Sequence, residues 1–125
     1  MKKGLIKKIY AYTACVICLV AGIIFLCVAI YGTIRIAAPG FTLSRWEWEK
    51  VATFQSFKTD WEKTEGALQL PDDELRIRWE DKREVAIAKE RREGWQNLIQ
   101  NLICLLVVTP LFIIHWRLAR RMPDE

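Results

Sequence analysis

The chain has 125 residues, of which 52% are hydrophobic and 27% charged, and its formal net charge is +4. The charges are unevenly distributed, because residues 9–34 and 95–116 contain no Asp, Glu, Lys or Arg. A soluble domain spreads its charge along the whole chain, and about 20 mainly apolar residues are enough to cross the hydrocarbon layer of a membrane. The composition therefore excludes a large soluble enzyme, and it predicts an integral membrane protein with two transmembrane helices.

Residues 1–8 form a basic tail that contains four lysines. The apolar segment behind this tail is longer than the core of a removable signal peptide, which has roughly 7–15 residues. We therefore expect the segment to be retained as a first transmembrane helix at 9–36. Pro39 predicts the end of this helix, because the residue before a proline disfavours the helical conformation.

The segment 37–94 is highly charged and is expected to form an extramembrane helical hairpin, with helices at 44–65 and 72–94. Ser44 and Glu47 have the spacing of a capping box, in which each side chain satisfies a free amide at the start of a helix. The segment contains no cysteine, so no disulfide is expected to hold the hairpin together.

Acidic residues follow Pro71 directly, and negative charge favours the first turn of a helix. Residues 75–79 alternate apolar and basic side chains, which would also suit a short strand. The sequence that follows them is rich in strong helix formers and favours a helix. Because no further proline occurs before Pro110, residues 72–121 can form one helix that is weakest at Gly94.

Residues 95–116 are expected to form the second transmembrane helix, followed by a basic C-terminal tail at 117–125. The predicted fold class is therefore all-α: two transmembrane helices in an antiparallel hairpin, extended by the charged helical hairpin outside the membrane. If the midpoints of the two helices near residues 21 and 107 share a depth, His115 and Tyr12 differ in depth by only a couple of ångströms. We expect His115 to contact Tyr12 or Tyr10.

Small residues recur along the first transmembrane helix at alternating steps of four and three, with Phe25 as the bulky exception. Such residues let two helices approach closely in lipid, although small residues are also generally abundant in membrane helices. The predicted packing residues of the first helix are Ala11, Cys15, Cys18, Gly22, Ala29 and Gly32. The matching series on the second helix is Asn97, Asn101, Cys104, Val108, Leu111 and His115, of which the two asparagines could instead lie among the lipid headgroups.

Aromatic residues with a polar atom favour the boundary between membrane and water. The residues expected at the two boundaries are Tyr10, Tyr12, Trp46, Trp48, Trp95 and Trp116. Pro110 removes a backbone hydrogen bond from the second helix and predicts a kink there.

The sequence indicates no catalytic, cofactor-binding or metal-binding residues. Cys15 and Cys18 have the spacing of a metal or redox pair, but a zinc site normally needs four ligands, so we interpret them as packing residues. His115 is the only histidine; it could bind heme iron with a ligand from a partner, although a structural role is the simpler interpretation. We expect no enzymatic activity, no cofactor, no nucleic-acid partner and no small-molecule substrate.

The two ends of the chain resemble a group of small bacterial membrane proteins of unknown function. The resemblance rests on Tyr10-Ala-Tyr12 near the start and on His115-Trp116-Arg117 near the close, which flank the transmembrane helices. It implies a bacterial membrane location and no particular activity.

These observations favour an accessory or structural subunit of a larger membrane complex. The alternatives are a homo-oligomeric pore or holin-like protein and a heme- or metal-binding redox subunit. The expected partners are membrane lipid and either other membrane subunits or further copies of the chain. The expected location is the bacterial inner membrane, with both termini in the cytoplasm because four lysines precede the first helix.

Overall fold

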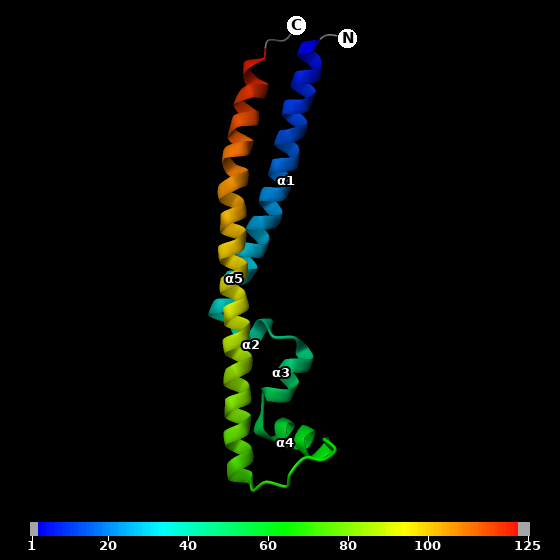
Figure 1. Cartoon of the computed structure of the whole chain (residues 1–125), viewed down its shortest axis with the longest axis vertical. Coiled ribbons are helices and arrows are strands. Elements are labelled where there is room, and N and C mark those ends of the chain that lie inside the picture. The colour runs from blue at the N-terminus through cyan, green and yellow to red at the C-terminus, as the bar shows by residue number, and fades with distance from the viewer. Residues whose placement is uncertain (1–2, 123–125) are drawn as a thin grey trace. The chain divides into compact units, whose positions relative to one another are not determined.

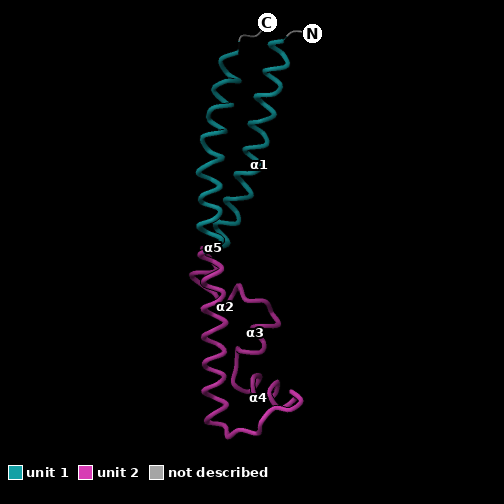
Figure 2. Tube along the Cα trace, in the orientation of Figure 1, with its two compact units in different colours: residues 1–32, 96–125 teal, residues 33–95 magenta. Residues whose placement is uncertain are grey.

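The computed structural model describes residues 3–122, and these residues form helices joined by short turns (Figure 1). The chain divides into two compact units (Figure 2). Unit 1 comprises Met1–Gly32 and Gln96–Glu125, and unit 2 comprises Thr33–Trp95. The all-α prediction is confirmed. Of the residues assigned to the two tails, those outside the described part of the chain are Met1, Lys2, Pro123, Asp124 and Glu125.

Helix α1 covers Lys3–Ala37, so it includes most of the expected basic tail as well as the apolar segment. It ends where the sequence predicts, because Ala38 precedes Pro39 and leaves the helical conformation at φ −134° and ψ 65°. Pro39 then starts the short helix α2, Pro39–Thr42. The first position of a helix suits proline, since its missing N–H has no partner there in any helix.

The expected helix at 44–65 is divided in two, α3 at Arg45–Val51 and α4 at Phe54–Lys63. Ser44 caps α3 as predicted: its hydroxyl accepts from the Glu47 amide at 3.3 Å and donates to the Glu47 carboxylate at 2.8 Å. Thr53 causes the division, because its hydroxyl accepts from the Ser56 amide at 3.2 Å and so caps α4. A threonine that binds a nearby amide in this way competes with the continuation of a helix.

Helix α5 covers Asp72–Arg121 and runs on through both Gly94 and Pro110. Residues 75–79 are therefore helical. The turn that leads into α5 contains Gly66, whose φ of +75° suits a residue without a side chain. At the start of α5 the Pro71 carbonyl accepts from the amides of Glu74 and Leu75, each at 3.1 Å.

In unit 1 the segments of α1 and α5 lie side by side and run antiparallel (Figure 2). In unit 2, α3 and α4 lie beside the first half of α5 (Figure 2), and Phe54 of α4 contacts Trp79 of α5. The buried apolar residues of unit 2 include Val51, Phe57 and Leu75. Trp79 links α5 to the end of α3, because its indole N–H donates to the Val51 carbonyl over 2.8 Å.

Candidate functional site

The two helices of unit 1 meet through small residues. On α1 the buried residues are Ala11, Cys15, Ala29 and Gly32, and Cys18 and Gly22 are half-buried. A Cβ atom added to Gly22 would lie 3.8 Å from Val108 Cγ1, in ordinary contact distance. The structure therefore places all six predicted small residues of α1 on one face.

The opposing face of α5 differs from the expected series at one position. Asn101, Cys104, Val108 and His115 are half-buried, but Leu111 is exposed and Phe112 is half-buried in its place. The expected series advances by 18 residues in five steps, which is the 3.6 residues per turn of a straight helix. His115, the next member of the series, is half-buried again, so the difference is confined to one turn.

Aromatic rings join the two helices near the ends of the chain. The ring centroids of Tyr10 and His115 are 6.0 Å apart with an edge-to-face arrangement, which confirms the predicted contact. Tyr12 packs in the same way against Trp116 at 6.4 Å. His115 Nδ1 lies 2.7 Å from the Leu111 carbonyl oxygen, and because a carbonyl only accepts, Nδ1 must carry the proton. The hydrogen-bond partner of His115 thus lies in α5 itself, whereas its contact with α1 is the ring of Tyr10.

The amide of Asn101 is also satisfied within its own helix. Its Nδ2 donates to the Asn97 carbonyl at 2.7 Å, and the Thr109 hydroxyl donates to the Leu105 carbonyl at 2.8 Å. These polar groups therefore make no hydrogen bond between the two helices. In unit 1, α1 and α5 contact each other through the close packing of small residues and aromatic rings.

Of the aromatic residues predicted at the membrane boundaries, only Trp48 is well covered within its unit. A Cβ on Gly40 would lie 3.2 Å from the Trp48 ring, so the indole packs on the backbone of α2. The exposed members of the set are Tyr10, Tyr12, Trp46, Trp95 and Trp116.

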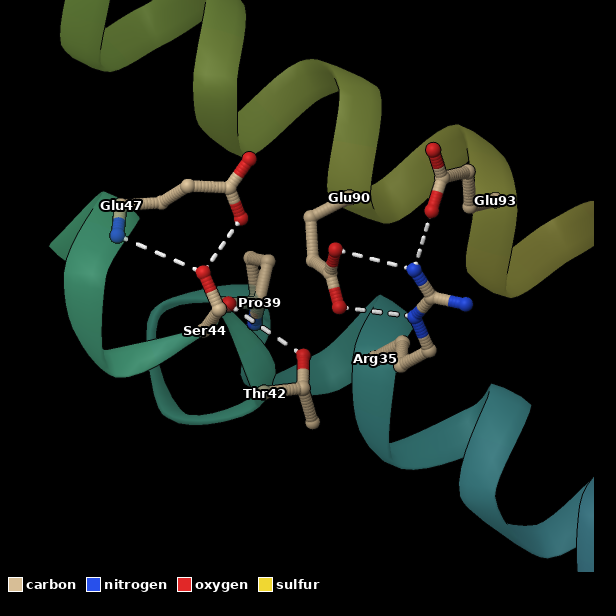
Figure 3. A network of polar contacts seen from close by, with 7 residues as sticks. All are labelled: Arg35, Pro39, Thr42, Ser44, Glu47, Glu90 and Glu93. Carbon is tan, nitrogen blue, oxygen red and sulfur yellow. Dashed lines mark hydrogen bonds and ion pairs between the residues drawn. The ribbon is translucent and has the colours of Figure 1, made fainter.

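An ion-pair cluster that sequence reasoning did not identify lies at the end of α1, in unit 2 (Figure 3). Arg35 Nε and Nη2 donate to the two carboxylate oxygens of Glu90 at 2.7 and 2.9 Å, and Nη2 also donates to Glu93. The exposed fractions of the Arg35 and Glu90 side chains are only 13% and 9%. The spacing of 55 residues between these partners gives no local signal in the sequence.

The Arg35 guanidinium holds the pKa of the Glu90 carboxyl below its usual range. Burial of Glu90 acts in the opposite direction, and the Thr42 hydroxyl adds to the lowering. The two-point geometry between guanidinium and carboxylate is among the stronger hydrogen-bonded arrangements in proteins. Glu90 is therefore ionised and fixed in place.

Rings and cations form a second layer in unit 2. Phe54 lies edge-on to Trp79 at 6.0 Å, and Phe57 lies 6.1 Å from Trp61. Cations of α5 lie over these rings, with Arg76 at 4.7 Å from Phe54. The other cations of α5 placed in this way are Arg78 over Trp61, Lys82 over Phe57 and Arg83 over Trp79. Within α3, Lys50 lies over Trp46. Much of the positive charge of unit 2 is thus engaged in internal packing.

All four cysteines are free, and within residues 3–122 no group of three or more His, Cys, Asp and Glu side chains is arranged to hold a metal ion. In comparisons with known proteins, no protein-family model matches the chain, and neither a curated protein nor a solved structure matches it. The resemblance of the chain ends to small bacterial membrane proteins gains no support from these comparisons.

Proposed function

We propose that the chain is a non-enzymatic integral membrane protein that serves as an accessory or structural subunit of a larger membrane complex. Both α1 and α5 are long and apolar enough to cross a membrane. Only 11% of the most apolar window of α1, and none of that of α5, is buried within the protein. A soluble core helix would be mostly buried, so this exposed apolar surface supports a covering of lipid or other membrane helices.

The observation that carries the subunit proposal is an apolar groove on unit 1, with a volume of about 250 Å³. Its lining includes Gly22 together with Cys18, Ile23, Val108 and Phe112. In lipid, helices associate through close fits of this kind rather than through the hydrophobic effect. A large apolar side chain of a partner helix would fill the groove.

The groove can be tested with two matched substitutions. Ile23 lines it, whereas the adjacent Ile24 does not, and the two side chains are 53% and 55% exposed. Full-length protein is purified gently from membranes, and the proteins that accompany it are identified. We expect Ile23→Trp to lose a defined partner that Ile24→Trp retains. Equal retention by both variants would contradict the groove as the binding surface, and a homo-oligomer without other proteins would favour the pore alternative.

We propose the bacterial inner membrane as the location, with both termini in the cytoplasm. Lysine and arginine near the ends of apolar helices set orientation, and four lysines occur in the first eight residues. Single cysteines are introduced into a variant that lacks the four native cysteines. Glu65→Cys places a thiol in the exposed turn before α5. It should react with a membrane-impermeant thiol reagent in intact cells, while Gly4→Cys should react only after lysis. The reverse pattern would reverse the orientation.

A further inference from the structure

Unit 1 brings a set of cations together at the end where the chain starts and finishes. The aromatic layer formed by Tyr10 with His115 and Tyr12 with Trp116 marks this end. Basic residues lie on both helices beyond or beside this layer, within roughly 3–10 Å along the helix axes at 1.5 Å per residue. The five that are exposed are Lys3, Lys7, Arg117, Arg120 and Arg121.

These five cations have no carboxylate partner within residues 3–122. No acidic residue occurs at 1–46 or at 94–123. Asp124 and Glu125 follow in the sequence, outside the described residues, and they leave the two tails together with a net positive charge. Ala119, which is 1% exposed, allows the helices to come close between the arginines. A concentrated positive charge of this kind attracts anions, and guanidinium groups bind phosphate through paired hydrogen bonds.

The cations of unit 2 near the apolar part of α5 have a different environment. Lys89, Arg91 and Arg92 are exposed too, but Glu90 and Glu93 alternate with them in the sequence. A phosphate that approached these three cations would meet the carboxylate of Glu93. Lys89, Arg91 and Arg92 therefore serve as a control set, because they carry the same charged groups but attract an anion less strongly.

We propose that the five cations and the aromatic layer of unit 1 form a binding site for the headgroups of anionic phospholipids. The proposal rests on the membrane placement proposed above. In that placement, the rings lie at the boundary between the acyl chains and the headgroups of the lipid, where amphipathic aromatic residues are favoured. The lysines and arginines contact the phosphates, and each basic residue near an anionic surface adds on the order of fivefold to the affinity.

The test uses the full-length protein in micelles of a zwitterionic detergent. Short-chain phosphatidylglycerol or phosphatidylcholine is added, and bound lipid is measured by native mass spectrometry. We expect the wild type to prefer phosphatidylglycerol. The triple variant R117Q/R120Q/R121Q should bind phosphatidylglycerol at least tenfold more weakly, while K89Q/R91Q/R92Q should stay within twofold of the wild type. The charge-preserving variant R117K/R120K/R121K should retain most of the binding, and circular dichroism should give equal helicity for all variants.

Three results would overturn the site: equal binding of the two lipids by the wild type, equal weakening by the two glutamine variants, or full displacement of lipid by inorganic phosphate at equal concentration. Extraction with alkaline carbonate tests the membrane placement separately. A protein that resists extraction while its triple glutamine variant binds normally would contradict the lipid site alone. A protein that is extracted would contradict the proposed function as well.

Discussion

The substitution Arg35→Met removes the charge of the Arg35 side chain and should destabilise the protein strongly. Arg35 and Glu90 are only 13% and 9% exposed, so the substitution leaves a buried carboxylate without its cation. Breaking a buried pair from one side typically costs about 3–5 kcal/mol. The cost of Glu90→Gln should be smaller, about 1.5–3 kcal/mol, because Arg35 keeps Glu93 as an ionised partner.

Glu93→Gln provides the internal control. The Glu93 side chain is 42% exposed, and an ion pair with an exposed partner contributes about 0–1 kcal/mol. The double variant Arg35→Met with Glu90→Met should be much less destabilised than Arg35→Met, since replacing both members of a buried pair by apolar residues is often nearly neutral. The assay is the free energy of unfolding in detergent micelles, followed by tryptophan fluorescence. A loss under about 0.5 kcal/mol for Arg35→Met, or a double variant as unstable as the sum of the single ones, would refute the reasoning.

Three further predictions concern separate parts of the chain. Because the folded pKa of Glu90 lies below its ordinary value near 4.5, the pair should contribute its full stability above that pH and lose it as the pH falls through the folded pKa; Glu90→Gln should abolish this part of the pH dependence of the unfolding free energy. Trp79→Phe removes the hydrogen bond to the Val51 carbonyl and should lower the unfolding free energy by about 1 kcal/mol, whereas the same change at an exposed tryptophan should have little effect. Gly22→Ala should be tolerated, since its Cβ would lie 3.8 Å from Val108, but Gly22→Leu should overpack the contact and cost about 1–3 kcal/mol in the same unfolding assay.

The sequence predicted the features that depend on residues close together along the chain. The absence of charge at 9–34 and 95–116 marks the two apolar helical segments, and Pro39 and Ser44 mark helix ends that the structure contains. The antiparallel register followed from helix rise alone, and the contact between Tyr10 and His115 agrees with it.

The features that the sequence did not reveal depend on contacts between distant segments. The break before Thr53 could have been suspected from its capping hydroxyl, but the Val51 carbonyl that the break frees is satisfied by Trp79, 28 residues away. Trp48 was expected at a membrane boundary because its aromatic side chain carries a polar atom, whereas it packs on Gly40 through a close approach that the short helix α2 creates. Arg35 is adjacent to an apolar segment and looked like an ordinary flanking charge, since nothing nearby in the sequence points to Glu90.

The cluster around Arg35 also opposes sliding of α1 along α5. Glu90 and Glu93 are about one helical turn apart, so a shift of one turn, about 5.4 Å, would leave Arg35 beside only one of the two carboxylates. In one direction Lys89 would also come close to the guanidinium and repel it. Only the present alignment therefore gives Arg35 both carboxylates in unit 2. A signal carried as a piston movement of one helix past the other would have to break the bidentate pair before the first turn of travel was complete.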